Sequence, residues 1–316
     1  MSGRARWATA SLVLIGLLAV ATLRSSATAT TLSPGGWTMI PPSHVSITGR
    51  LTDRRLAEAS GAAASRANPG VIWTIDDSGN PPDLLAIDTT GALRADFTVA
   101  GASNVDWEEV ALGPCGSGQC VYIADTGDNG EHRRDVVIYR VPEPTVGAGL
   151  VSGVQSLTGM ESIRAAYPDR PHDVEAMAVT DSGEILLVTK GRSGGVLLFS
   201  IPADAWRSGR LVTPVLRDSL PITPAGGMGR EVTGMALASD GKRVVVRTYR
   251  DLYPFTLRPD GKLAPMGKPT ACDILGLEPQ GEGVTFLRDG RLLLTSERGL
   301  FKAGTVILLN CAPLDL

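Results

Sequence analysis

The side chains in this sequence that could carry chemistry are carboxylates placed just ahead of apolar, strand-like runs. Residues 105–113, VDWEEVALG, put Asp106, Glu108 and Glu109 before alternating apolar residues. Like charges crowded at the start of a strand repel one another unless a cation or a proton compensates them. The stretch therefore predicts that these carboxylates face a ligand, a metal ion or basic side chains of the fold.

Similar stretches recur along the chain, and their spacing indicates repeated structural units. Each begins with Glu, Asp or Gln and continues with small or apolar residues at alternate positions, which is typical of a strand. The stretches are EASGAAAS from Glu58, DWEEVALG from Asp106, DVEAMAVT from Asp173, EVTGMALA from Glu231 and QGEGVTFL from Gln280. Their starts lie 48, 67, 58 and 49 residues apart. Internal similarity at such periods predicts the blades of a β-propeller.

Further strands follow each stretch, and no long amphipathic helix interrupts them. Runs such as VIWTIDDSGN, CVYIADTGDN and KRVVVRTYRD are rich in Val, Ile and Tyr, and turns such as SDG at 239–241 suit hairpins. We therefore expect an all-β fold, a β-propeller of five four-stranded blades. HVSITGRL, residues 44–51, is expected to supply the last strand of the fifth blade and so close the ring. A sixth blade hidden in the 67-residue interval is the alternative.

In such a ring the first strand of each blade lines the central channel, so the recurring acids are expected to meet at one rim. There they could bind a ligand or partner, or act as general acid and base. The predicted ligand-binding residues are Asp77, Asp106, Glu108, Glu175, Lys190, Glu231, Arg247, Glu282 and Glu297. The catalytic candidates are Glu108, Asp173, Glu175, Glu282 and His172.

Calcium is the cofactor that these oxygen donors would suit, because Ca²⁺ takes six to eight oxygen ligands. DTGDNGE, residues 125–131, offers Asp125 and Asp128 on a Gly-rich turn, although the spacing is not that of an EF-hand. Two other interpretations stay open. The Asp residues could shape the turn, and the rim acids could form buried ion pairs with Lys190, Arg247 and Arg298.

Composition narrows the function classes. The 316 residues carry a formal net charge of −3 without a clustered basic stripe, so nucleic acid is not expected as a partner. Aromatic residues are only 5%, which disfavours stacking on sugars or bases. There is no G-x-S-x-G motif and there are three His residues, which disfavours a serine hydrolase. No Walker-type loop is present.

The N-terminal segment and the cysteines indicate export. Residues 1–29 have a basic start, an apolar run and the triplet Ala27-Thr28-Ala29, the layout of a cleaved signal peptide; an uncleaved N-terminal anchor is the alternative. Residues 30–43 are then a linker and 44–316 the propeller domain. We expect the even set of four cysteines to form disulfides Cys115–Cys120 and Cys272–Cys311 in an oxidising compartment, outside the cell or in its envelope.

At DWEEVALG…VYIADTGDN and DVEAMAV the chain resembles secreted bacterial β-propeller proteins. These include NHL-repeat proteins, phytase-like and esterase-like propellers, and calcium-dependent lactonases. The likeness covers most of residues 45–313 at the level of the repeat and brings no family active site with it. It implies calcium, with Lys190, Arg247 or Arg250 beside the cation if phosphate is handled. Fold alone does not define function.

Three functions remain open from sequence. The first is an exported propeller that binds an unidentified ligand or protein at the acidic rim, with or without a divalent cation. The second is a calcium-dependent hydrolase of a phosphoester, ester or lactone. The third is a structural protein of the cell envelope. No membrane contact is expected beyond the N-terminal anchor, and the sequence names neither a substrate nor an oligomeric state.

Overall fold

The computed structural model describes residues 38–39, 44–147, 153–207, 210–224, 229–266, 272–273, 276–300 and 302–309. The predicted signal peptide, most of the predicted linker and Cys311 lie outside these ranges. Among the described residues, none of the helices has the length and apolar character needed to cross a membrane.

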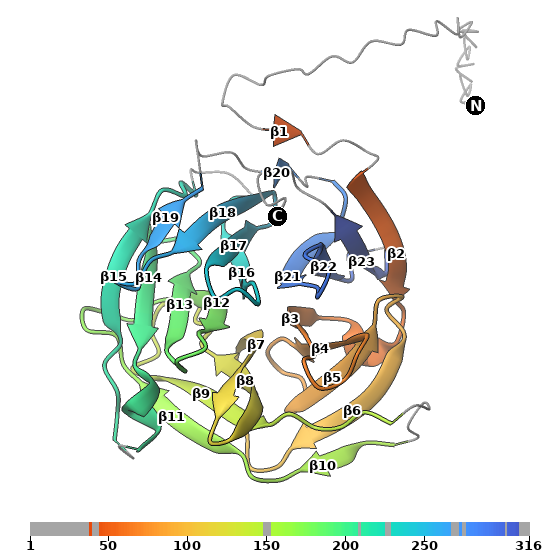
Figure 1. The fold of residues 1–316 in the computed structure, drawn as a ribbon, viewed down its shortest axis with the longest axis horizontal. Coiled ribbons are helices and arrows are strands. Elements are labelled where there is room, and N and C mark those ends of the chain that lie inside the picture. The colour runs from red at the N-terminus through yellow and green to blue at the C-terminus, as the bar shows by residue number, and fades with distance from the viewer. Residues whose placement is uncertain are drawn as a thin grey trace, which may run out of the picture. The chain divides into compact units, whose positions relative to one another are not determined.

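The described chain forms a five-bladed β-propeller, as predicted (Figure 1). Each blade is built around four antiparallel strands, and in blades 1 to 4 the strands run outward from the central channel in chain order. Blade 1 holds β3 (Ala59–Ala64), β4 (Val71–Asp76), β5 (Asp83–Asp88) and β6 (Leu93–Val99). Blade 2 holds β7 (Trp107–Cys115), β8 (Gly118–Asp125), β9 (Val136–Pro142) and β11 (Glu161–Ala165). Blade 3 holds β12 (Val174–Val179), β13 (Ile185–Thr189), β14 (Val196–Ile201) and β15 (Val215–Leu220).

Blades 4 and 5 recruit strands from the N-terminal part of the chain. Blade 4 holds β16 (Val232–Leu237), β17 (Arg243–Thr248) and β18 (Asp251–Leu257), with β19 (Leu263–Pro265) and β20 (Cys272–Asp273) on its outer edge. β1 (Thr38–Met39), inside the predicted linker, pairs in parallel with β20. Blade 5 holds β21 (Gln280–Phe286), β22 (Leu292–Glu297), β23 (Gly304–Leu309) and β2 (Val45–Leu51). Short 3-10 helices span Arg54–Leu56 (η2) and Ala203–Arg207 (η3).

The predicted closure of the ring is confirmed. β2 pairs antiparallel with β23, from Val45 opposite Leu309 to Leu51 opposite Gly304. A strand from near the start of the propeller thereby covers the edge that β23 would otherwise expose.

The long interval between the second and third repeats is an extended outer segment rather than a sixth blade. β10 (Gln155–Leu157) runs back to pair in parallel with β6 of blade 1. β11 then returns as the fourth strand of blade 2. The segment therefore ties two neighbouring blades together along their outer edges (Figure 1).

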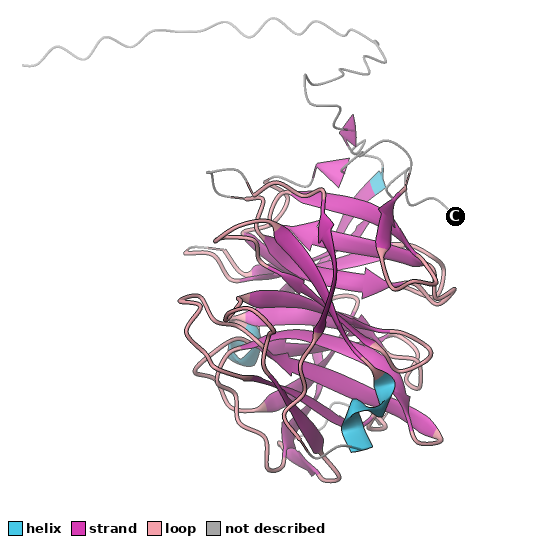
Figure 2. Cartoon of the chain, turned by 90° about the vertical axis from the view of Figure 1, so that its left-hand side faces the viewer, coloured by secondary structure: helices cyan, strands magenta, loops and turns pink. Residues whose placement is uncertain are grey.

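The apolar core is divided among the interfaces between neighbouring blades. Five clusters of buried side chains occupy these interfaces, one at each. Trp73 and Trp107 are both fully buried in the cluster between blades 1 and 2, where they pack against Phe97 and Tyr139. Figure 2 shows the ring from the side, where strands make up most of the described chain and the helical turns are short.

All five inner strands have a β-bulge near their start. The register of β3, β7, β12, β16 and β21 against the second strand shifts after Ser60, Trp107, Val174, Val232 and Gly281 respectively. A bulge inserts an unpaired residue and turns the side chains beside it. The inner edges of these strands have no neighbouring strand, so their N–H groups need other partners in the channel.

Glu109 of β7 supplies such partners by extending its side chain across the channel. Its Oε1 accepts hydrogen bonds from the N–H groups of Ala62 on β3, at 3.3 Å, and of Val110, at 3.0 Å. Its Oε2 accepts one from the N–H of Met235 on β16, at 3.0 Å. The side chain is fully buried. One carboxylate therefore links three blades at the axis and divides the channel into two ends.

The other repeats leave room for Glu109 because they hold small residues at the equivalent position. Those residues are Gly61, Ala176, Gly234 and Gly283. A Cβ on Gly61 would lie 2.7 Å from Glu109 Oε1, and a Cβ on Gly234 would lie 3.2 Å from Oε2. A larger residue at either glycine would displace the carboxylate.

Removing this carboxylate is expected to destabilise the whole ring. Glu109→Ala leaves three buried N–H groups without their acceptor and should lower the free energy of unfolding by about 3 kcal/mol or more. Glu109→Gln keeps one acceptor oxygen and should lower it by about 1–3 kcal/mol. Urea unfolding followed by circular dichroism measures both. Glu161→Gln, at a carboxylate with 60% side-chain exposure, is the control and should change little. Equal midpoints for Glu109→Ala and the control would refute the role given to Glu109.

Candidate functional site

One end of the channel gathers buried and half-buried carboxylates, and we call it the acidic mouth. It forms where the loop before each inner strand meets the end of the second strand of the same blade. The N–H of Asp77 bonds the carbonyl of Glu58 at 3.0 Å, and the N–H of Lys190 bonds that of Asp173 at 2.9 Å. The acidic mouth consists of Asp77, Asp106, Glu108, Asp173, Glu175, Lys190, Glu282 and Glu297. Asp76 lies beside it, in the wall of a neighbouring pocket that Arg55 and Asp83 also line.

Asp77, Asp106 and Glu108 form the first group within the mouth. Each offers a carboxylate oxygen, and the three oxygens lie within 4.8 Å of one another. Burial and the neighbouring Asp77 carboxylate raise the pKa of Asp106 to about 6. Burial, Glu175 and Asp77 raise the pKa of Glu108 well above its usual range. These three carboxylates thus repel one another and would gain from a cation held between them.

Gly127, just after β8, makes the space in which these oxygens meet. A Cβ on Gly127 would lie 2.2 Å from Glu108 Oε1 and 2.6 Å from Asp106 Oδ2. The Gly127 N–H donates to the Asp106 carbonyl at 3.1 Å, which holds the backbone in this position. The carboxylates can therefore surround this position only because residue 127 has no side chain.

Glu108, Asp173 and Glu175 form a second group, and it contains an ammonium of the protein itself. Their carboxylate oxygens also lie within 4.8 Å of one another. Lys190 Nζ is 2.5 Å from Glu175 Oε1 and 3.8 Å from Asp173 Oδ2. Burial lowers the pKa of Lys190, but Glu175 and Asp173 outweigh it and raise that pKa above its usual value. Lys190 is therefore charged and neutralises part of this group.

The remaining acids lie on the side of blades 1 and 5. Glu282 accepts a hydrogen bond from Gln280 Nε2 at 3.0 Å and is hydrogen-bonded to Glu297. Burial, Asp77 and Glu58 raise the pKa of Glu297 to about 7. Asp76 at the end of β4 is 7% exposed, and its Oδ1 has no hydrogen-bond partner among the described residues. Burial and Glu58 raise the pKa of Asp76 to about 8.

Several predicted site residues lie outside this group. Arg247 is fully buried between blades 4 and 5, where it pairs with Glu278 and donates to the carbonyls of Gly283 and Thr295. Arg247 is thus part of a buried ion pair, but its partner is Glu278 rather than one of the rim acids. Glu231 is half-buried, 3.6 Å from Arg192 Nε.

The turn after β8 and the predicted His residue also have internal partners. Asp125 is fully buried, 2.9 Å from Arg133 Nη2, and Asp128 Oδ2 accepts from the Arg133 N–H at 2.6 Å. His172 is buried, with Nε2 3.0 Å from Asp169 Oδ1 and its ring against Tyr167 and Phe199. These contacts support structural roles in shaping the turn and packing blade 3.

The predicted disulfide Cys115–Cys120 is present and closes the β7–β8 hairpin. The predicted Cys272–Cys311 pair involves Cys311, which lies outside the described residues.

Sequence comparison gives no relatives, since no protein-family model and no curated protein matches the chain. Structural comparison finds propellers of low similarity. The soluble aldose sugar dehydrogenase of Escherichia coli is 12% identical with a TM-score of 0.48, over 84% of this chain and 99% of that one. A gluconolactonase of Xanthomonas campestris is 13% identical with a TM-score of 0.44, over 84% and 95%. The calcium-binding protein regucalcin of Agrobacterium tumefaciens is 13% identical with a TM-score of 0.43, over 86% and 95%. Likenesses of this size carry no inference about activity.

Raised carboxyl pKa values at the mouth and beside it make stability depend on pH. A carboxyl group whose pKa is higher in the folded state binds more protons when folded, between its unfolded and its folded pKa. For Asp76 that window runs from about 4 to about 8, so its contribution is present below pH 4 and is lost as pH rises through 8. The Asp76→Asn variant lacks this carboxyl group and therefore does not lose this stability as the pH rises. Its free energy of unfolding, relative to the parent chain, should increase by about 2 kcal/mol or more between pH 4.5 and 8.5.

Urea unfolding at steps of half a pH unit measures this difference. Asp204→Asn, at an exposed residue of η3, is the matched control and should follow the parent chain at every pH. Superimposed profiles for Asp76→Asn and the parent would contradict the assignment.

Proposed function

We propose that this chain is an exported binding propeller whose acidic mouth holds a divalent cation, Ca²⁺, between Asp77, Asp106 and Glu108. The observation that carries the proposal is the convergence of these three carboxylate oxygens within 4.8 Å around the space left by Gly127. Hard oxygen donors of this kind are the ligands that Ca²⁺ prefers.

The charges around the site favour a cation from outside the protein. Lys190 is paired with Glu175 and Asp173, and of the first group it acts on Glu108, which belongs to both groups. Asp77 and Asp106 are half-buried and thus reach solvent, whereas Glu108 is buried behind them. Three carboxylates leave several of the six to eight Ca²⁺ positions to water or to an oxygen-bearing ligand. The cation would therefore be the point at which the propeller engages its ligand or partner.

Export is part of the proposal. The disulfide Cys115–Cys120 is of the kind that persists in oxidising compartments. Together with the signal-peptide layout of residues 1–29, it supports a place outside the cell or in its envelope.

A calcium-dependent hydrolase is the second candidate, and the contact between two carboxyl groups favours it. Glu175 is hydrogen-bonded to Glu108, and both are buried beside Lys190. A carboxyl group with a raised pKa next to a metal site can exchange a proton with a bound water or leaving group. The substrate classes are those expected from sequence, a phosphoester, ester or lactone.

Calcium binding predicts a stabilisation that depends on the three carboxylates. Thermal melting with Ca²⁺ and with a chelator should show a higher melting temperature with Ca²⁺, equivalent to about 2.7 kcal/mol when free Ca²⁺ is a hundredfold above the dissociation constant. The shift should grow between pH 5 and pH 8, because protons compete for Asp106, whose pKa is raised to about 6.

Two variants and a control sharpen this test. Asp106→Asn removes a charged ligand, and Gly127→Ala places a methyl group that would push the Glu108 and Asp106 carboxylates out of position, so both should abolish the shift. Asp204→Asn should retain it. A parent chain that melts at the same temperature with and without Ca²⁺ would disprove the cation site, as would a full shift in Asp106→Asn.

The hydrolase is tested by turnover of a chromogenic phosphomonoester, a chromogenic ester and a simple lactone in the presence of Ca²⁺. If it is correct, Glu175→Gln should lose at least about 100-fold in kcat, the usual scale of general acid–base catalysis, while Asp204→Asn keeps the parent rate. No Ca²⁺-dependent turnover of any of the three would contradict the hydrolase candidate.

A further inference from the structure

A pocket of about 750 Å³ lies against blade 1, beside the acidic mouth. In the sheet of this blade Leu85 lies opposite Thr74 of β4 and Asp96 of β6. Side chains two residues apart share a face of a strand, so Asp76 and Asp83 lie on the same face as Leu85. The segment at η2 supplies the other wall. The pocket is lined by Asp53, Arg54, Arg55, Asp76, Asn80, Pro81, Asp83 and Leu85.

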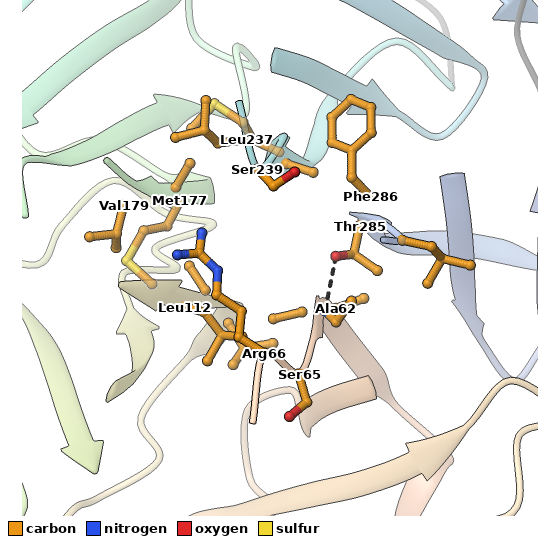
Figure 3. Close-up of a pocket in the computed structure, with 18 of the residues that line it drawn as sticks. Ala62, Ser65, Arg66, Leu112, Met177, Val179, Leu237, Ser239, Thr285 and Phe286 are labelled. Atoms are coloured by element: carbon orange, nitrogen blue, oxygen red, sulfur yellow. Dashed lines mark hydrogen bonds between the residues drawn. The ribbon is translucent and has the colours of Figure 1, made fainter. Parts of the chain in front are cut away.

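This pocket differs from the one at the far end of the channel, which has a volume of about 170 Å³ (Figure 3). There the Thr285 hydroxyl accepts the Ala64 N–H at 3.0 Å, and Arg66 is 3.7 Å from Asp181. These polar groups therefore have partners within the protein. The pocket on blade 1 contains a buried charged group that lacks one.

The guanidinium of Arg55 in the pocket wall is bound to other acids. Its Nε and Nη2 donate to the two carboxylate oxygens of Asp53, at 3.0 and 2.8 Å. Its Nη1 donates to Asp96 Oδ2 at 3.0 Å, which ties η2 to the face of blade 1. Arg55 is therefore engaged by two carboxylates, and neither of them is Asp76.

Asp76 is the group in this pocket that calls for a ligand. Its side chain is 7% exposed, and its Oδ1 has no hydrogen-bond partner among the described residues. The charges that act on it come from the carboxylates of Glu58, Glu297, Asp77 and Asp83. A buried polar oxygen without a donor costs free energy, and neighbouring negative charges add to that cost. A ligand that brings a positive charge and N–H donors to Asp76 would recover both.

Asp83 and Asn80 add acceptors to the same pocket. Asp83 Oδ1 accepts the Thr98 hydroxyl at 2.6 Å, and a carboxylate can accept about four hydrogen bonds, so acceptor capacity remains. Asn80 Nδ2 donates to Glu58 Oε2 at 2.6 Å and to the Asp77 carbonyl at 3.1 Å, so its amide oxygen is the group it can offer. A primary ammonium group has three N–H donors to match them.

These acceptors suit an organic ammonium group better than a metal ion. The described acids form two groups whose oxygens lie within 4.8 Å of one another, and neither group includes Asp76 or Asp83. A divalent metal ion needs several oxygens at about 2.0–2.6 Å, whereas an ammonium group bonds acceptors at about 2.7–3.2 Å. Arg54 and Arg55 also line the pocket and would repel a ligand with several positive charges.

We propose that this pocket binds a small polar molecule through a single primary ammonium group, which Asp76 and Asp83 accept. The positive charge would offset the buried Asp76 carboxylate, and the hydrogen bonds would be charge-assisted. The rest of the ligand would extend along the polar wall towards η2. This site does not depend on the proposed calcium site, whose ligands are Asp77, Asp106 and Glu108.

The probe is 3-amino-1,2-propanediol, compared with glycerol and glycerate, which replace its ammonium group by a hydroxyl group and a carboxylate. Isothermal titration calorimetry on the full-length protein at pH 8.5, above the pKa of about 8 that Asp76 has in the folded chain, measures all three. The amine should bind most tightly. Asp76→Asn should weaken it at least about tenfold, and Asp83→Asn should also weaken it. Asp88→Asn, at the other end of β5, is the matched control and should bind as the parent chain does.

The outcomes separate this site from the acidic mouth. Asp106→Asn should bind the amine as the parent does, so loss of the Ca²⁺ effect with amine binding intact would count against the calcium site alone. Glycerol or glycerate binding as tightly as the amine would overturn the present proposal, and this comparison needs no variant. Failure of the parent chain to bind the amine would overturn it too. So would equal affinities in Asp76→Asn and the parent.

Discussion

The backbone groups that line the centre of the ring set the constraint on which this structure depends. An inner strand has a partner on one side only, so its other edge points N–H and carbonyl groups into a narrow channel. Glu109 accepts hydrogen bonds from three of these N–H groups, each in a different blade. Burial raises the pKa of this carboxyl well above its usual range, and the three N–H donors oppose that rise. The carboxylate is stabilised only while the blades hold their places.

This arrangement gives the two ends of the channel different characters. At the acidic mouth, on one side of Glu109, the carboxylates lie close together and repel one another. Lys190 offsets only part of this repulsion. On the other side of Glu109, the same five strands line a small pocket that has both apolar and polar groups. A fold of repeated blades would make the two ends nearly uniform around the axis. It is the unequal residues at equivalent positions, such as Glu109 against Gly61 and Gly234, that create local sites.

The sequence predicts the fold well because the pattern is periodic. Acid-led, alternating stretches mark the inner strands β3, β7, β12, β16 and β21 in the right places, and residues 44–51 form the closing strand β2. The convergence of Asp77, Asp106, Glu108 and Glu175 also follows from the ring.

What periodicity cannot give is the direction of side chains beside a bulge. The register shift after Trp107 breaks the two-residue alternation, so Glu109 turns into the channel although its neighbour Glu108 reaches the mouth. The contrast with small residues in the other repeats was the available signal for Glu109. Gly127 acts through the close approach of two carboxylates to its Cα, which spacing alone does not encode.

The way in which β2 completes blade 5 has a consequence for the order of assembly. β2 is among the first strands of the propeller to be synthesised, yet its partner β23 is the last. Blades 1 to 4 can form their hairpins as the polypeptide emerges, but the circle stays open until residue 309 is available to pair with Val45. The hydrogen bonds from β3 and β16 to Glu109 across the channel would then form late, after all five blades have reached their final positions. Maturation of both channel ends would thus be a single, final event rather than a gradual one.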